Sequence, residues 1–335
     1  MRISQALPQY LAYRRGEGYS KNTIKADRVA VNRLMEVVGD RDLDSITPVL
    51  VDGLYAEMTR RQLRASTVNL ATACLRSFFK WAIERGYRSQ EAGSPVLGRR
   101  YRPREAKTLT RVPLAQFPAL LEAARSPRDR MLLALGIYTM ARKEEITGIR
   151  IRDVDLDSGE IQVYVSKSNV FDRRPISTEL DLELRRWLTA YAEEVGPLEP
   201  DYFLVPAVHG GTRSKTTHGW RLRPRKQMVS PEDVVHSVLK PLGIDDSYHS
   251  GMHVLRRSAA RARFDELTAQ GYDGALRQVS AWLNHKSTAQ TEIYLGLELD
   301  RANRDEQTKG KPLFPSLAAS NVRHLEVPNG QDRTA

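Results

Sequence analysis

Residues 252–264 read MHVLRRSAARARF, a run that is typical of a helix. His253 and Arg256 are three positions apart within it, so on a helix both side chains project from one face toward a shared ligand. An HxxR pair also arises by chance in basic helices, and alone it indicates little. Its meaning depends on the motifs that lie on either side of it.

A second motif follows on the carboxyl side. Residues 282–287 read WLNHKS after a short predicted helix, and Tyr294 comes nine residues after His285. A tyrosine hydroxyl titrates near about 10 and is a weak nucleophile alone. It becomes useful where surrounding cations favour the phenolate and the transition state. Tyr294 is therefore a candidate nucleophile among basic residues.

A third motif precedes the first. Residues 139–146 read TMARKEEI and place Arg142 just after an apolar helix that is predicted to begin near Ser126. The guanidinium group matches phosphate oxygens through paired N–H donors and stays charged at any working pH. Arg142 and Arg256 together indicate a phosphoryl-transfer pocket.

A β-hairpin is predicted between these arginines. Residues 161–165 alternate between apolar and polar side chains, which predicts a strand. Residues 174–176 predict the return strand, after a loop that holds Asn169 and Asp172. Lys167 then lies at the hairpin tip or just before it.

In order and spacing, these motifs resemble the tyrosine recombinase (phage integrase) family. The resemblance covers residues 110–300 as the catalytic domain and extends more loosely to the segment before it, which in the family contacts core recombination sites. It implies a mainly α fold with a small antiparallel β-sheet, made of an all-helical amino-terminal core-binding domain and an α+β catalytic domain.

The resemblance also implies a role for each motif residue. Arg142 and Arg256 match the two arginines that clamp the scissile phosphate, and Tyr294 matches the nucleophile. Lys167 matches the hairpin lysine associated with protonating the leaving 5′ oxygen. The remaining members are two pocket histidines and an acidic residue that can orient the first arginine: His253, His285 and Glu145.

Three positions depart from the family pattern. Met140 stands where Thr-Gly-Leu-Arg has glycine, so this turn cannot rely on glycine's freedom. Asn284 replaces the glycine of Leu-Gly-His, and asparagine can still adopt a left-handed conformation. Arg257 stands where many relatives carry a second histidine. These departures affect the fine geometry of the site.

The implied function is a site-specific DNA recombinase, or integrase, that works through a 3′-phosphotyrosyl intermediate. Neither a metal, nor a cofactor, nor ATP is expected. The role expected is integration or excision of a phage or mobile element. The implied partners are double-stranded core recombination sites, a homotetramer on synapsed DNA and a directionality factor. Chromosome-dimer resolution, a type IB topoisomerase activity and a relative that has lost catalysis remain alternatives.

The sequence before the catalytic domain predicts helices. Ser20 and Thr47 are expected to cap two of them, the second with Pro48 at its first position. A third is expected from near Ser66 to Gly86. The apolar side chains expected on its buried face are Leu70, Leu75, Phe78 and Phe79.

Composition divides the chain further. The expected domains are residues 1–95, a basic linker 96–112, the catalytic domain 113–300 and a tail 301–335 that can serve subunit exchange. No additional arm-binding domain is expected before residue 1. Candidate DNA contacts lie in the linker, at Arg99, Arg100, Arg102, Arg104 and Lys107. A second set lies in a stretch without acidic residues, at Arg213, Lys215, Arg221, Arg223, Arg225 and Lys226.

Charge and composition agree with a nucleic-acid partner. The 335-residue chain has a net charge of +11, and residues 1–107 hold 20 Lys and Arg against 11 Asp and Glu, or +9. A strongly basic surface attracts polyanions, although many soluble proteins are basic. The single cysteine, Cys74, suits a reducing compartment, and no signal peptide or membrane span is evident. A cytoplasmic protein is expected.

Competing motifs are weak. Asp153, Asp155 and Asp157 resemble the start of a calcium loop, but the glycine is one place late and Tyr164 stands where the final glutamate belongs. A β-turn is the better interpretation. Tyr248 and Tyr272 are interpreted as surface or packing residues. Phosphate-loop, nucleophile-elbow and zinc-helix motifs are not present.

Overall fold

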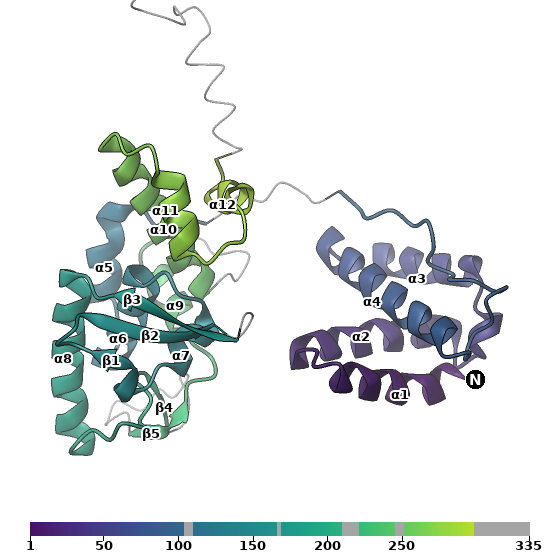
Figure 1. The fold of residues 1–335 in the computed structure, drawn as a ribbon, viewed down its shortest axis with the longest axis horizontal. Coiled ribbons are helices and arrows are strands. Elements are labelled where there is room, and N and C mark those ends of the chain that lie inside the picture. Colours follow the sequence, from purple (N-terminus) through teal and green to yellow (C-terminus); the bar gives the residue numbers. More distant parts are fainter. Residues whose placement is uncertain (104–109, 166–168, 210–220, 245–250, 298–335) are drawn as a thin grey trace, which may run out of the picture. The chain divides into compact units, whose positions relative to one another are not determined.

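The computed structural model describes residues 1–103, 110–165, 169–209, 221–244 and 251–297. The chain divides into two compact units, Met1–Thr108 and Leu109–Ala335 (Figure 1). In the part of the chain that the structure describes, the first unit is helical apart from one isolated bridge between Arg2 and Asp42, and the second combines helices with two small antiparallel sheets. The mainly α architecture predicted from the sequence is confirmed.

The first unit is built from helices with the predicted caps. Its elements are α1 (Ile3–Gly16), α2 (Lys21–Val38), the 3-10 turn η1 (Leu43–Ser45), α3 (Pro48–Arg60) and α4 (Ala65–Glu84). The Ser20 hydroxyl accepts a hydrogen bond from the Thr23 amide, and the Thr47 hydroxyl accepts one from Leu50. The prediction that Leu70 is buried was wrong, because Leu70 lies two positions after Val68 and faces the opposite side of α4.

Aromatic side chains fill the core of this unit. Tyr10 contacts Phe78 edge-on at 5.3 Å between ring centroids and lies 5.2 Å from Trp81. Beside them, the buried guanidinium of Arg14 donates to Asp27 at 2.9 Å. Cys74 is buried in the same core as a free thiol, as is common for this small apolar side chain.

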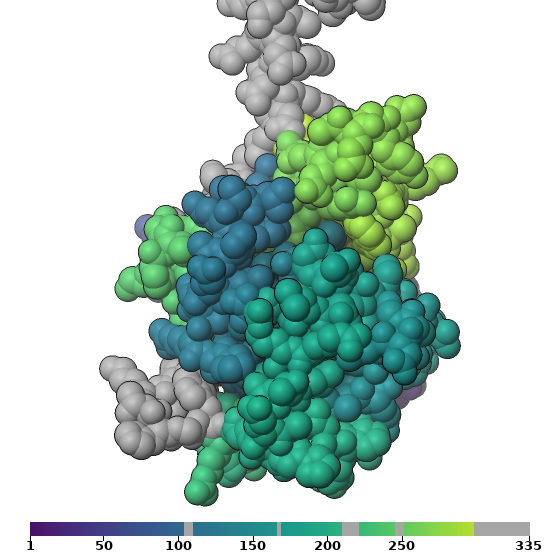
Figure 2. Space-filling model, turned by 90° about the vertical axis from the view of Figure 1, so that its left-hand side faces the viewer, coloured from purple at the N-terminus to yellow at the C-terminus, as the bar shows by residue number. Residues whose placement is uncertain are grey.

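The second unit packs helices around its sheets. The helices are α5 (Phe117–Glu122), α6 (Pro127–Tyr138), α7 (Lys143–Gly148), α8 (Thr178–Val195), α9 (Glu232–Leu239), α10 (Met252–Ala269), α11 (Ala275–Trp282) and α12 (Thr288–Leu295), with 3-10 turns η2 (Leu114–Gln116) and η3 (Ile151–Asp153). The face shown in Figure 2 is formed by α5, α8 and the segment from α10 to α11. Within the described ranges, the helices are too short or too polar to cross a lipid bilayer.

Two antiparallel sheets complete this unit. The strands are β1 (Val154–Asp155), β2 (Glu160–Val165), β3 (Val170–Pro175), β4 (Pro206–Val208) and β5 (Leu222–Gln227), in the orders β1-β2-β3 and β4-β5. The β2–β3 hairpin was predicted, but its second strand starts earlier than expected. Asp172 pairs with Val163 and therefore lies in the strand, not in the loop. The β4–β5 pair was not predicted.

The turn between β1 and β2 accounts for the acidic cluster. The Asp155 carboxylate accepts hydrogen bonds from the amides of Asp157 and Ser158, both at 3.0 Å. Gly159 follows with φ of +66°. The interpretation of this stretch as a turn is confirmed.

Close packing of α6 on α10 sets the position of the site. Gly136 in α6 lies so near α10 that a Cβ atom there would be 2.9 Å from Cδ1 of Leu255. The residues just after α6 and the residues of α10 are thereby brought side by side. Arg142 and Arg256 come from these two segments.

Candidate active site

Arg142 is presented by a tight turn at the end of α6. Thr139 donates its hydroxyl to the Leu135 carbonyl at 2.6 Å and accepts the Ala141 amide at 3.2 Å. Met140 has φ of +50°, a left-handed conformation that costs a residue other than glycine about 1 to 2 kcal/mol. Methionine therefore occupies the conformation for which glycine is suited, and other contacts must hold the turn.

The buried Glu145 carboxylate fixes the Arg142 side chain. Its Oε1 accepts from Nη1 of Arg142 at 2.8 Å, and its Oε2 accepts from the Arg142 main-chain amide at 2.7 Å. Arg142 is therefore the residue that precedes the first turn of α7, where the Glu145 side chain caps its amide, and the expected ion pair is present. A charged hydrogen bond of this kind is roughly twice as strong as a neutral one.

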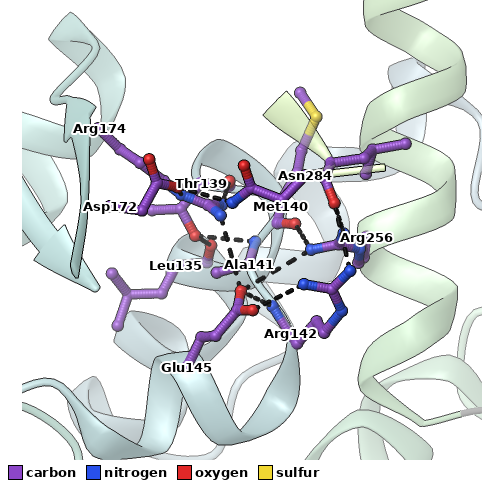
Figure 3. A network of polar contacts seen from close by, with 11 residues as sticks. Leu135, Thr139, Met140, Ala141, Arg142, Glu145, Asp172, Arg174, Arg256 and Asn284 are labelled. Carbon is purple, nitrogen blue, oxygen red and sulfur yellow. Dashed lines mark hydrogen bonds and ion pairs between the residues drawn. The ribbon is translucent and has the colours of Figure 1, made fainter. Parts of the chain in front are cut away.

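Arg256 reaches the same place from α10. Its buried guanidinium group donates to the carbonyls of Met140 and Leu283, the second at 2.5 Å, and Arg142 also donates to the Leu283 carbonyl at 3.4 Å (Figure 3). Burial lowers the pKa of Arg256 to about 10, which leaves it charged at neutral pH. Each guanidinium has five N–H donors. The contacts above use two in each, and the others suit a phosphate.

Tyr294 lies in α12 beside these groups. Its hydroxyl is buried without a hydrogen bond among the described residues. Desolvation raises its pKa, whereas the charges of Arg256 and Arg257 act to lower it. The Arg257 guanidinium lies 5.5 Å from the centre of the tyrosine ring. The tyrosine hydroxyl is therefore buried next to cationic side chains that can also bind a phosphate.

His285 packs against the tyrosine. The two rings meet edge-on with centroids 5.3 Å apart, and Nδ1 of His285 lies 3.0 Å from the Thr291 hydroxyl. The preceding Asn284 has φ of +49°, the left-handed conformation anticipated for it. This turn aims the imidazole toward α12.

The two remaining expected site residues are His253 and Lys167. Desolvation, together with the charges of Arg256 and Arg257, lowers the pKa of His253, although part of its side chain reaches the surface. This shift favours the neutral imidazole. Lys167 lies outside the described residues. The structure thus brings together five of the expected side chains and places a sixth nearby, and these are Arg142, Glu145, Arg256, His285 and Tyr294, with His253.

Sequence reasoning missed an ion pair on β3 between a buried arginine and a partly exposed aspartate. Nε of Arg174 donates to Asp172 at 2.9 Å, and Arg174 is 4% exposed. Nη2 of Arg174 lies 3.6 Å from the Glu145 carboxylate (Figure 3). Arg174 pairs with Ile161, a buried position of β2, and this register became known only from the structure.

The candidate DNA-contacting residues fall into three groups. Arg99 pairs with Asp52, and Arg102 donates to Thr59 at 2.7 Å, so both are engaged within the first unit. Arg225 pairs with Glu199. The remaining described members are exposed, and they are Arg100, Arg221, Arg223 and Lys226. Outside the described residues lie Arg104, Lys107, Arg213 and Lys215, together with the tail from residue 301 and Tyr248.

Comparisons with known proteins agree with this geometry. Residues 110–300 match the Phage integrase family, and residues 7–86 match the phage integrase N-terminal SAM-like domain. Tyrosine recombinase XerC of Herpetosiphon aurantiacus is 26% identical over 328 residues, which cover 94% of this chain and 98% of that protein. Tyrosine recombinase XerA of Thermococcus kodakarensis is 26% identical, over 92% of this chain and 96% of that protein.

Solved structures share the fold. A lambda integrase fragment, crystallised as a dimer bound to a COC′ core site, superposes with a TM-score of 0.66 at 18% identity, covering 88% of this chain and 95% of that one. XerH recombinase bound to a palindromic difH substrate gives 0.63 at 17% identity, over 86% and 80%. The chain belongs to the phage integrase family of tyrosine recombinases, which are DNA strand-transferring enzymes.

Proposed function

We propose that Tyr294 is the nucleophile of a site-specific recombinase and that Arg142 and Arg256 clamp the scissile phosphate. The observation that carries this proposal is the Leu283 carbonyl, which accepts from both guanidinium groups, together with the buried Tyr294 hydroxyl, which lies near Arg256. The Leu283 carbonyl oxygen thus lies where the N–H donors of both arginines point. A phosphate oxygen has the same preference for these donors.

The chemistry follows from this placement. The Tyr294 oxygen attacks the phosphorus in line, the bond to the 5′ oxygen breaks, and a 3′-phosphotyrosyl link and a 5′ hydroxyl result. The tyrosine proton is released, and Lys167 supplies a proton to the leaving oxygen. Charge that gathers on the non-bridging oxygens is met by Arg142, Arg256 and His285 without solvent reorganisation. His253 completes the pocket. Attack by a 5′ hydroxyl of another strand rejoins the DNA.

We further propose that the enzyme integrates or excises a phage or mobile element in the cytoplasm of its host, as a tetramer on two core sites and with a directionality factor. The lambda integrase structures, one of which is a tetramer on a Holliday junction, support this choice by fold. Relatives named XerC and XerA keep chromosome-dimer resolution as the second candidate. The exposed Arg100, Arg221, Arg223 and Lys226 are the proposed backbone contacts.

Footprinting on the DNA that flanks the gene identifies a substrate. A nicked suicide duplex of that site then traps a covalent complex with the wild-type protein. Tyr294→Phe is expected to trap none, whereas the exposed Tyr272, changed to Phe, serves as the matched control and keeps full trapping. Trapping by Tyr294→Phe would refute the proposal. Relaxation of one supercoiled plasmid without exchange between two duplexes would favour the topoisomerase alternative.

A further inference from the structure

Two turns with left-handed residues present the groups of this site, and one strand touches both. Met140 lies in the turn before Arg142, and Asn284 lies in the turn before His285. Neither residue is glycine, so each turn needs contacts that hold it against its steric cost. The contacts come from Asp172 and Arg174 on β3.

The first turn is held through main-chain carbonyls. Nη1 of Arg174 donates to the Thr139 carbonyl at 2.5 Å, and Arg256 donates to the next carbonyl, that of Met140. Two arginines from different elements thus grip consecutive peptide groups around the left-handed residue. Arg174 also lies 3.6 Å from Glu145, the residue that orients Arg142.

The second turn is held through a side chain. Nδ2 of Asn284 donates to Oδ2 of Asp172 at 2.9 Å, and the same Oδ2 accepts from Nε of Arg174 at 2.9 Å. Glycine at position 284 would have no side chain with which to make this contact. The hydrogen bond therefore ties the loop that carries His285 to the hairpin strand.

We propose that Asp172 and Arg174 are positioning residues that clamp both turns and hold Arg142 and His285 in register for cleavage. The proposal deepens the recombinase function and rests on it. A guanidinium group buried on a strand is costly unless it is paired. This one donates to the Asp172 carboxylate and the Thr139 carbonyl and lies 3.6 Å from the Glu145 carboxylate. Figure 3 shows the three contacts converging on the Arg174 side chain.

The main variant is Arg174→Lys, measured by single-turnover cleavage of the suicide duplex at saturating protein, with DNA affinity measured separately. A lysine keeps the positive charge, but its single ammonium group lacks the planar guanidinium fork with which arginine reaches Asp172, Thr139 and Glu145 together. We expect unchanged affinity and a cleavage rate about 100-fold lower, because small displacements of catalytic groups have effects of that size. The matched control is Arg173→Lys on the same strand, since Arg173 is 72% exposed and pairs with Glu160.

A double-mutant cycle tests the link to the second turn. Asn284→Gly removes the hydrogen bond without adding strain, and we expect about 10-fold slower cleavage. In an Asp172→Ala background the same change should have no further effect, because its partner is already gone. A full 10-fold loss in that background would overturn the link.

Circular dichroism at the assay temperature establishes that each variant is folded. A wild-type cleavage rate in Arg174→Lys would refute the proposed role of Asp172 and Arg174. If trapping still required Tyr294 in that case, the proposed recombinase function would stand. Failure of the wild-type protein itself to form a covalent adduct would instead contradict the proposed function.

Discussion

Replacing Glu145 by glutamine should lower the free energy of unfolding of the second unit more than removing any other single charge near the site. The side chain is 3% exposed and its oxygens lie 2.8 Å from Arg142, 3.6 Å from Arg174 and 4.0 Å from Arg256. Glutamine keeps the shape, yet it removes the negative charge that separates three guanidinium groups. The amide also points N–H donors at N–H donors.

The size of the effect can be bounded. At an effective dielectric constant of about 20, a charge pair at 4 Å is worth about 4 kcal/mol before desolvation is counted. Breaking a buried ion pair by removing one partner costs about 3 to 5 kcal/mol, because the other charge stays buried. Domains are stable by about 5 to 15 kcal/mol, so the second unit would lose a large part of its free energy of unfolding.

Urea denaturation followed by tryptophan fluorescence measures this loss, since Trp187 is buried in the second unit. With a slope of about 2 kcal/mol per molar urea, the midpoint should fall by about 1.5 to 2.5 M. Glu144→Gln is the matched control. Its side chain is 64% exposed and pairs with Lys143 at 4.0 Å, so a change below about 0.5 kcal/mol is expected. Equal midpoints for the two variants would refute the role given to Glu145.

Other perturbations test the remaining groups. Arg256→Ala should leave DNA affinity near wild type but slow cleavage at least about 100-fold, and wild-type cleavage would contradict the clamp. His253 should titrate below 6.5 by NMR. Because its pKa is lowered in the folded state, the unfolded state binds the proton first, and stability should fall as pH drops through 6.5. The variant His253→Asn should show a smaller fall. Asp27→Asn should destabilise the first unit by about 3 to 5 kcal/mol, as calorimetry can check, by leaving Arg14 unpaired. Burial raises the pKa of Cys74 to about 12, so alkylation at pH 8 should require unfolding; rapid labelling of native protein would contradict this.

Part of this structure could be predicted from the sequence because it depends on local interactions. Ser20 and Thr47 were predictable as helix caps because each hydroxyl accepts a hydrogen bond from an amide only three residues later in the chain. The alternation of residues 161–165 predicted β2 for a similarly local reason. The site residues Arg142, Arg256 and Tyr294 could be named because order and spacing resemble a known family.

Contacts between distant segments were not readable. The burial of Leu70 was misjudged because the buried face of α4 depends on the helices packed against it. The β4–β5 pair was missed because strands as short as Pro206–Val208 carry little periodicity.

The sequence by itself determined which groups of this protein can do phosphoryl chemistry and which segments carry them, since side-chain type and helix spacing are local properties. Only the tertiary structure decided that Arg174 and Asp172 hold the turns at Met140 and Asn284. Those contacts join residues 35 and 112 positions apart. They exist because hairpin register and the packing of α6 on α10 bring the segments together, and no spacing along the chain encodes that geometry.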